Sequence, residues 1–435
     1  MSDQKYAERV ATTRVDRLRW WQEARFGMLV HWNLATELGC AGWGMNRELI
    51  PFDIYDRALD RWHPKDRPAR EWVRLAKTAG QKYAVFTAKH HEGLCLWDTR
   101  QTDYNTMQRG PGRDFVREFV EACREFDLRV GLYYSLMDWH HPDAERSATD
   151  ETARRRFVDF TRGCLRELVT QYGKIDMLWY DMDFPLRGAD QWETAKTNGM
   201  IRDLQPDILI RDPVGLDTDY AHVEQQTSTN SESPAWEATA CTAGARGWIY
   251  EGTWNWNPVT HSWRTPNEVL GMLCTIAGGQ GNLLLNIGPE PDGSVPKQAV
   301  QLLTTLGEWL ERNGEAVYGH LDRAGGYVNG AWRGPMEWGP RGQWTLQGKT
   351  GYFWCYRWPG KELSIAGLKT KVNAVSLLAD GAPVAFRQTD KHLSLTGLPK
   401  LNPDNIAGVT VVKIDFDAPP SQKIDVYEQP PASYS

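Results

Sequence analysis

Over its first three-quarters the chain alternates apolar strand segments with amphipathic helical segments, and this alternation limits the fold more than any other feature. Residues 83–89 (YAVFTAK), 128–135 (LRVGLYYS) and 175–181 (IDMLWYD) are largely continuous apolar runs. Such runs are typical of strands that are buried on both faces of a parallel sheet. Between two of them, residues 113–127 carry apolar side chains at helical spacing. The repetition predicts an α/β fold, and the number of units favours a closed (β/α)8 barrel over an open sheet.

The remaining barrel elements follow the same pattern. Additional strands are expected at residues 26–32, 208–212 and 282–289, and additional helices at residues 69–80, 153–172, 190–204, 268–279 and 297–314. The helical segments carry an apolar stripe on one side, as expected for helices that cover the outside of a barrel.

The pattern changes near residue 325. Short strand-like segments such as residues 343–348 and 408–416 now follow one another, separated by Gly, Asp and Pro turns, with no long helix between them. This pattern predicts an antiparallel sandwich of roughly 100 residues. Because 435 residues exceed one ordinary core, we expect two domains. These are a catalytic (β/α)8-like barrel over residues 1–322 and a small β-sandwich over residues 323–435.

Composition argues against several classes of partner. The net charge is −6 without a basic block, so neither nucleic acid nor an anionic membrane surface is an expected partner. No stretch approaches the roughly 18 apolar residues of a membrane span, and the polar N-terminus lacks a signal-peptide core, so we expect a cytoplasmic protein. The seven scattered cysteines are typical of reduced core thiols. The 21 tryptophans are a hint of sugar binding, because an indole is a good platform for the apolar face of a sugar ring.

Polar and aromatic side chains gather where the predicted strands end. They are His31 and Trp32, His90 and His91, Tyr133 and Tyr134, and Trp179 with Asp181. Since the active sites of (β/α)8 barrels lie at the carboxyl ends of the strands, we expect these groups to form one pocket suited to a polyhydroxylated ring. Neither a metal nor a cofactor is expected. The pairs His90–His91 and His140–His141 lack metal-ligand spacing, and adjacent side chains on a strand point in different directions.

A carboxylate in such a pocket indicates glycoside hydrolysis, which normally needs two carboxyl groups. Asp181 is one of them. The second is expected from a later loop, where Glu224 (AHVEQQT) and Glu237 (PAWEATA) are both candidates. Each could equally be an ordinary loop carboxylate, and the residues alone leave the choice between them open.

Several longer stretches resemble the α-L-fucosidase family of glycoside hydrolases (family 29). They run from about residue 20 to 300 and are ARFGMLVHWN, WGMNRELIPFDIYD, KYAVFTAKHHEGLCLWDTRQTDYN, RGPGRDFVREFVEACREFDLRVGLYYSLMDWHHP, MLWYDMDFP, VEQQ and GGQGNLLLNIGPEPDGSVP. The resemblance implies a retaining enzyme that releases α-L-fucose from fucosylated oligosaccharides or glycosides through a covalent intermediate. It places the nucleophile on Asp181 and the acid/base on Glu224, with Glu237 as the second candidate for the acid/base.

The resemblance also implies which residues hold the sugar. His31, His90, His91 and Tyr133 correspond to the positions that bind fucose hydroxyls, and Trp43 and Trp179 to those that line the ring.

Three departures from the family pattern bear on specificity. Asn33 stands where the family has glycine, Gly42 where it usually has glutamate, and Pro213 where it usually has arginine, although Arg211 is nearby. The missing carboxylate at position 42 predicts a looser pocket on one edge of the sugar, with remote binding energy from the aglycone. The tryptophans expected to stack on that aglycone are Trp248, Trp254 and Trp256. Two alternatives remain: the same chemistry on an α-L-galactoside or α-L-glucoside, and a catalytically silent sugar-binding protein on the same barrel.

Overall fold

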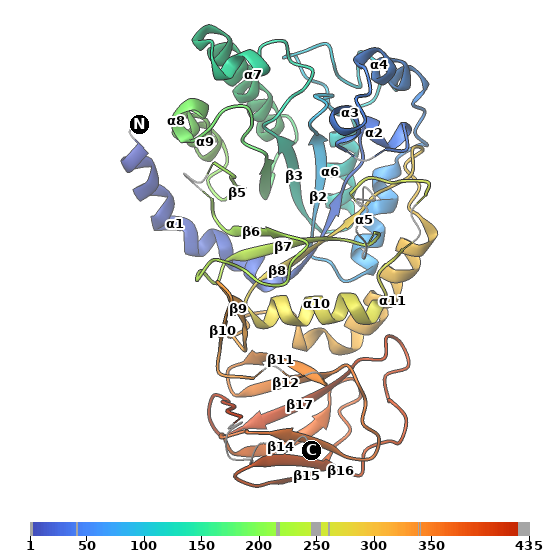
Figure 1. The fold of residues 1–435 in the computed structure, drawn as a ribbon, viewed down its shortest axis with the longest axis vertical. Helices are drawn as coiled ribbons and strands as arrows, with labels where there is room; N and C mark the ends of the chain where they lie inside the picture. The colour runs from blue at the N-terminus through green and yellow to red at the C-terminus, as the bar shows by residue number, and fades with distance from the viewer. Residues whose placement is uncertain are drawn as a thin grey trace, which may run out of the picture.

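The computed structural model describes residues 3–40, 42–214, 218–244, 254–259, 262–337, 339 and 341–424. Figure 1 shows a barrel of parallel strands with its helices at one end of the molecule and antiparallel sheets at the other. Helices α10 and α11 lie between the two parts (Figure 1). The predicted fold class, a (β/α)8-like barrel followed by a small β-sandwich, is confirmed.

Eight parallel strands form the barrel sheet, in the order β5-β4-β3-β2-β1-β8-β7-β6. They are β1 (Phe26–Val30), β2 (Tyr83–Lys89), β3 (Arg129–Ser135), β4 (Met177–Asp181), β5 (Leu209–Arg211), β6 (Ala221–Glu224), β7 (Trp236–Cys241) and β8 (Asn282–Ile287). Strands β1, β2 and β8 are buried along their whole length, which explains why these predicted strands are largely continuous apolar runs. The ladder ends at β5 and β6, the two outermost strands of this sheet, so the barrel is nearly closed.

Helices cover the outside of the barrel. They are α1 (Asp3–Ala24), α2 (Leu34–Glu37), α3 (Gly44–Arg47), α4 (Phe52–Arg61), α5 (Pro68–Thr78), α6 (Phe115–Glu125), η1 (Glu145–Ala148), α7 (Glu151–Thr170), α8 (Ala189–Trp192), α9 (Thr194–Leu204), α10 (Pro266–Gly278), α11 (Lys297–Asn313) and η2 (Gly314–Ala316). Local chemistry sets several of their starts. The Asp114 side chain caps α6 by accepting from the Arg117 amide, and Thr265 forms a capping box with Glu268 at α10.

The segment from 212 to 235 differs from the prediction. Glu224 and Glu237 were expected in loops, but they lie on β6 and β7. Within the described part of this segment, no helix joins β5 to β6 or β6 to β7. Strand β7 reads WEATAC, in which small and polar residues interrupt the apolar run, although all of them are buried. Its β-structure depends on pairing with β6 and β8, which local propensity does not reveal.

The C-terminal part contains three antiparallel sheets. Strands β9 (Gly326–Val328) and β10 (Ala331–Arg333) pair with each other; β11 (Gly342–Gln347), β12 (Thr350–Cys355), β17 (Thr410–Phe416) and β14 (Val372–Leu377) form a second sheet; β13 (Leu363–Ala366), β16 (His392–Thr396) and β15 (Ala385–Gln388) form a third. Side chains from the two larger sheets, including Leu393 and Ile414, share one buried core. The domain boundary at residue 323 stays a prediction.

Most of the large buried aromatic side chains belong to the core. The indoles of Trp21, Trp32, Trp62, Trp72, Trp97, Trp236, Trp309 and Trp354 are fully buried, so core packing accounts for much of the tryptophan content that hinted at sugar binding. All seven cysteines are buried, as expected for core thiols. Among the described residues, no helix has both the length and the apolar character needed to cross a membrane.

Candidate active site

A cavity of about 280 Å³ opens at the carboxyl ends of the barrel strands. It is lined by Leu29, His31, Gly42, Trp43, Arg47, His90, His91, Tyr133, Trp179, Asp181, Met182, Glu224, Thr239 and Trp254. Of the residues predicted to catalyse the reaction or hold the sugar, all but Glu237 are in this set. Trp32 and Tyr134, which were expected in the same pocket, are instead buried in the hydrophobic core. The mixture of aromatic rings, imidazoles and two carboxyl groups in one concave site is the usual composition of a small polar-ligand pocket.

Asp181 is the last residue of β4, and its carboxylate faces the cavity with its side chain 26% exposed. One oxygen, Oδ1, accepts from the Met182 amide at 3.0 Å. The other, Oδ2, accepts from the Tyr133 hydroxyl at 2.7 Å and lies 3.8 Å from Nε2 of His91. Both oxygens are thus oriented, yet the group remains accessible from the cavity. Asp183, the second acidic residue of the same stretch, pairs instead with Arg187 at 3.6 Å.

The three histidines pack together along one wall. The ring centroids of His90 and His91 lie 3.9 Å apart, and His31 lies 5.5 Å from His90. Burial, followed by the neighbouring charge of His90, holds the pKa of His31 and of His91 well below its usual value, so both rings are neutral near pH 7. Within the described residues, no group of three His, Cys, Asp or Glu side chains could hold a metal ion.

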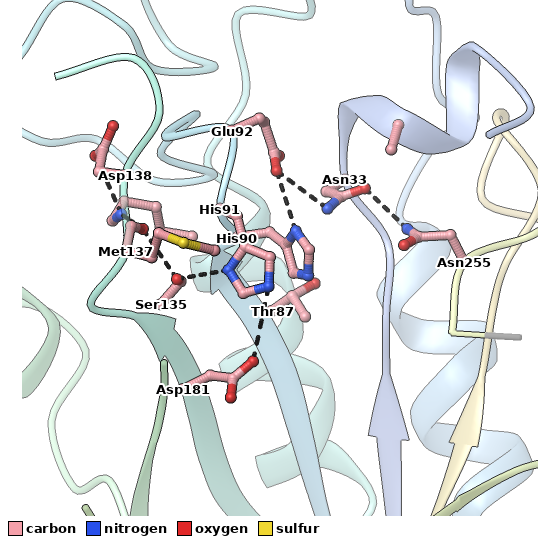
Figure 2. Close-up of polar contacts among 12 residues, drawn as sticks. Asn33, Thr87, His90, His91, Glu92, Ser135, Met137, Asp138, Asp181 and Asn255 are labelled. Atoms are coloured by element: carbon pink, nitrogen blue, oxygen red, sulfur yellow. Dashed lines mark hydrogen bonds and ion pairs between the residues drawn. The ribbon is translucent and has the colours of Figure 1, made fainter. Parts of the chain in front are cut away.

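The expectation that His90 and His91 point in different directions is wrong. Strand β2 ends at Lys89, so the alternation of a strand no longer applies to the two residues that follow it. His90 is held by Nδ1, which lies 3.2 Å from Oε2 of the buried Glu92. Figure 2 shows Glu92 also reaching Asn33, whose oxygen meets Asn255.

Trp179 and Tyr133 continue the aromatic lining next to the histidines, because the Tyr133 ring lies 5.4 Å from that of His31 and 5.8 Å from that of His90. The rings of Trp179 and Tyr133 are stacked with centroids 5.4 Å apart, and the Arg211 guanidinium lies 4.4 Å from the centre of the Trp179 ring. The indole N–H of Trp179 donates to Glu237 at 3.0 Å. Trp43 stands nearer the mouth, 5.1 Å from the His91 ring. These contacts fix the indole planes before any ligand enters.

The two glutamates that the sequence left open occupy different environments. Glu224 ends β6, is exposed, and lines the cavity. Its pKa is raised by the partial desolvation of its carboxyl group in the cavity and by the charge of Asp181, while a hydrogen bond from Trp254 lowers it. Glu237 is 0% exposed and does not line the cavity. It accepts from the Tyr83 hydroxyl at 2.6 Å and from Trp179.

Burial raises the pKa of Glu237 to about 7, and this predicts a pH-dependent stability. A pKa raised in the folded state favours folding below the unfolded value and loses that contribution as the pH rises towards the folded value. As the pH rises from 5 to 8, the unfolding free energy of the parent chain should fall by about 2–3 kcal/mol relative to that of the Glu237→Gln variant, which cannot ionise at this position. Urea unfolding of both proteins at each pH measures this difference. If the difference in unfolding free energy between the two proteins is the same at every pH, the Glu237 carboxyl does not titrate in this range.

Comparison with known proteins defines the family. The sequence model of the family described as Alpha-L-fucosidase matches residues 1–315. The chain belongs to the α-L-fucosidase family. It is 28% identical to the plasma alpha-L-fucosidase of Homo sapiens over 419 residues, which cover 88% of this chain and 86% of that relative. It is an α-L-fucosidase-like glycoside hydrolase.

Solved structures of the family share the whole fold. Alpha-L-fucosidase isoenzyme 1 from Paenibacillus thiaminolyticus superposes with a TM-score of 0.80 at 29% identity, covering 93% of this chain and 100% of that one. An α-L-fucosidase from Bacteroides thetaiotaomicron, trapped as a covalent intermediate with 2-fluoro-fucosyl fluoride, has a TM-score of 0.78 at 25% identity and covers 93% and 96% of the two chains. That member of the family therefore forms a covalent intermediate, which is the mark of a retaining mechanism.

The three departures from the α-L-fucosidase pattern now have positions. A Cβ atom at Gly42 would lie 2.6 Å from Cε1 of His90 and 2.8 Å from Oδ1 of Asn255. The space is therefore filled, and the looser pocket expected there is not found. Asn33 joins the same cluster, because its Oδ1 accepts from Asn255 Nδ2 at 2.8 Å. Pro213 does not line the cavity.

We expect replacement of Gly42 by Ala to weaken sugar binding. The added methyl group must displace His90 or Asn255, because overpacked sites shift rather than compress. KM for the substrate should rise about 10-fold, consistent with loss of one good hydrogen bond. The matched control is Gly271→Ala, since nothing lies within 4 Å of a Cβ atom there. If KM is unchanged in the Gly42 variant, His90 and Asn255 can move away from the added methyl group without any loss of sugar binding.

Some lining residues were not found from the sequence. Leu29, Arg47 and Met182 line the cavity and lie within the stretches that resemble the family, but they were not singled out as site residues. Thr239 also lines the cavity and lies outside those stretches. Of the aglycone candidates, Trp254 lines the cavity and its ring packs 5.2 Å from that of His31, whereas Trp248 lies outside the described residues. Trp256 is not among the lining residues. A polar residue inside an apolar run, such as Asn286 in NLLLNI, was the available signal for groups that support the histidines.

Proposed function

We propose that this chain releases α-L-fucose from fucosylated glycans or glycosides by double displacement, with Asp181 as nucleophile and Glu224 as acid/base. One observation carries the proposal: these two carboxyl groups, and not Glu237, line the cavity. The imidazole and indole walls suit a ring that carries both hydroxyl groups and an apolar face.

In the first step an Asp181 oxygen attacks the anomeric carbon, and the bond to the leaving oxygen breaks. Glu224, protonated, gives its proton to that oxygen. The Met182 amide and the Tyr133 hydroxyl hold the Asp181 carboxylate in its attacking orientation. The raised pKa of Glu224 keeps a proton on it at a pH where an ordinary glutamate would have lost it.

In the second step water attacks the same carbon and displaces Asp181. Glu224, now ionised, takes the proton of that water, which restores both carboxyl groups to their starting states. Two inversions at one carbon return the original configuration. The proton that Glu224 gives up in the first step is regained here, so one residue serves as acid and then as base.

An aryl-glycoside panel tests the proposal. The chain is assayed with aryl α-L-fucoside, α-L-galactoside, α-L-glucoside and β-D-glucoside, and the anomer first released is followed by proton NMR. We expect hydrolysis of the α-L-fucoside with α-L-fucose as the first product. A preference for another α-L-glycoside would replace the substrate assignment. Absence of hydrolysis, together with retained sugar binding, would indicate the silent sugar-binding alternative.

A further inference from the structure

Two of the cavity histidines have their ring protons fixed by residues behind them. We infer that Ser135 and Asn286 are positioning residues that hold His91 and His31 as Nδ1–H tautomers, so that each presents an Nε2 lone pair to the cavity. The ligand must then supply hydroxyl hydrogens on this wall. The tautomers follow from the contacts alone; that the hydroxyl groups belong to an α-L-fucoside rests on the proposed function.

The His91 tautomer follows from Ser135, the last residue of β3. The Ser135 hydroxyl donates to the Met137 carbonyl at 2.9 Å, and a hydroxyl has one proton to give. Its oxygen also lies 2.7 Å from Nδ1 of His91. That second contact is a hydrogen bond only if Nδ1 carries the proton and Ser135 accepts. Figure 2 shows the resulting line from Met137 through Ser135 and His91 to Asp181.

The His31 tautomer follows from Asn286 on β8. The Asn286 amide nitrogen donates to the Trp254 carbonyl at 2.8 Å. A flipped amide would place two oxygens against each other, so the orientation is determined by a backbone group that can only accept. The Asn286 oxygen consequently faces Nδ1 of His31 at 3.1 Å and must accept from it.

Both rings therefore face the cavity with a bare nitrogen. Each is neutral, because burial lowers its pKa, and a neutral imidazole has one N–H. Two neighbouring donors of the cavity are already engaged: the Tyr133 hydroxyl donates to Asp181, and the Trp179 N–H to Glu237. His91 Nε2 and Asp181 Oδ2 are both acceptors and face each other at 3.8 Å. A ligand hydroxyl that donates its hydrogen to one of them would relieve the repulsion between them.

The first test reads the tautomers directly and needs no activity. Long-range proton–nitrogen NMR of the histidine-labelled protein distinguishes Nδ1–H from Nε2–H rings, and the signals missing from His31→Gln and His91→Gln variants assign the two residues. We expect Nδ1–H with bare Nε2 for both at pH 7. An Nε2–H ring or an imidazolium at either position overturns the inference, whatever the protein hydrolyses.

The second test removes one support. In Ser135→Ala the His91 Nδ1–H loses its acceptor, so the proton should move to Nε2, where Asp181 can accept it. We expect the NMR signature of His91 to change and kcat/KM to fall about 10- to 100-fold. Ser147→Ala is the matched control, since that buried hydroxyl also donates to a backbone carbonyl, at 2.6 Å, but no histidine contacts it. An unchanged His91 tautomer in Ser135→Ala contradicts the role of Ser135.

A third test uses the ligand and depends on the proposed function. L-Fucose analogues with one hydroxyl replaced by hydrogen or by fluorine are compared as inhibitors. Fluorine cannot donate, so at the positions that contact His31 and His91 both replacements should weaken binding equally. Recovery of binding by fluorine at every position would overturn the inference. If no analogue and no fucose binds, the proposed function fails while the NMR result still decides the tautomers.

Discussion

Replacement of Asp181 by Gly or Ala should lower kcat by about 10³-fold or more, which corresponds to about 4 kcal/mol in the barrier. The side chain ends β4 at the cavity, and both carboxylate oxygens are oriented by the Met182 amide and the Tyr133 hydroxyl. Removing the nucleophile leaves binding and proton donation in place but prevents the covalent step. Steady-state and single-turnover kinetics on an activated aryl fucoside measure the loss.

The neighbouring Asp183 supplies the control for this experiment. Asp183→Ala removes a carboxylate two residues away that pairs with Arg187 rather than facing the cavity, so its activity should stay close to that of the parent chain. Melting temperatures of both variants show whether folding is intact. An Asp181 variant that keeps more than about a tenth of the activity, a loss of only about 1.4 kcal/mol, would refute the nucleophile assignment. Azide should restore turnover in Asp181→Gly and give a glycosyl azide of inverted configuration.

Replacement of Glu224 by Ala should produce the second largest effect, and its size should depend on the leaving group. A general acid contributes about 10²- to 10⁴-fold where the leaving oxygen needs a proton. Natural fucosides should therefore lose activity by that factor, whereas aryl fucosides with good leaving groups should lose much less in the first step. Rates for a series of aryl fucosides of graded leaving-group pKa measure this dependence.

The pH profile gives an independent reading of Glu224. Activity needs the protonated carboxyl, so it falls as the pH rises through the pKa of Glu224, and the raised pKa places that fall at higher pH than for an ordinary glutamate. The alkaline fall should disappear in Glu224→Ala. Glu237→Gln is the comparison variant, because its side chain lies behind Trp179 and away from the cavity. If Glu237→Gln instead shows the leaving-group dependence and loses the alkaline limb, the acid/base lies on β7.

Much of the barrel was predictable because its strongest signals are local. A strand such as YAVFTAK is buried on both faces and is apolar over most of its length, and a helix such as α6 keeps one apolar face. The pattern of apolar residues along the chain therefore predicts which segments are buried. Strands β6 and β7 were not predictable in this way. Their small and polar residues are β-structure because neighbouring strands pair with them.

For the candidate active site, too, the sequence predicted some features and not others. The position of Asp181 at a strand end follows from the barrel pattern, and the roles predicted for His31, His90, His91, Tyr133 and Glu224 came from resemblance to the α-L-fucosidase family. The sequence also determined where this chain departs from its relatives, at Asn33 and Gly42. It did not determine what these departures do. From the sequence, Gly42 only lacks a side chain, whereas the structure shows that His90 and Asn255 occupy the space next to it.

Only the tertiary structure placed Glu224 in the cavity and Glu237 outside it, and gave the contacts from which the histidine tautomers are inferred. Glu224 lines the cavity, whereas Glu237 contributes no surface to it and accepts from the Trp179 N–H, because the strand register places Glu237 beside His222, two residues before Glu224. The proton on His91 depends on Ser135, which is 44 positions away, and that on His31 on Asn286, which is 255 positions away. Hydrogen bonds and desolvation act through space, so a pKa or a tautomer belongs to the folded neighbourhood and not to the residue.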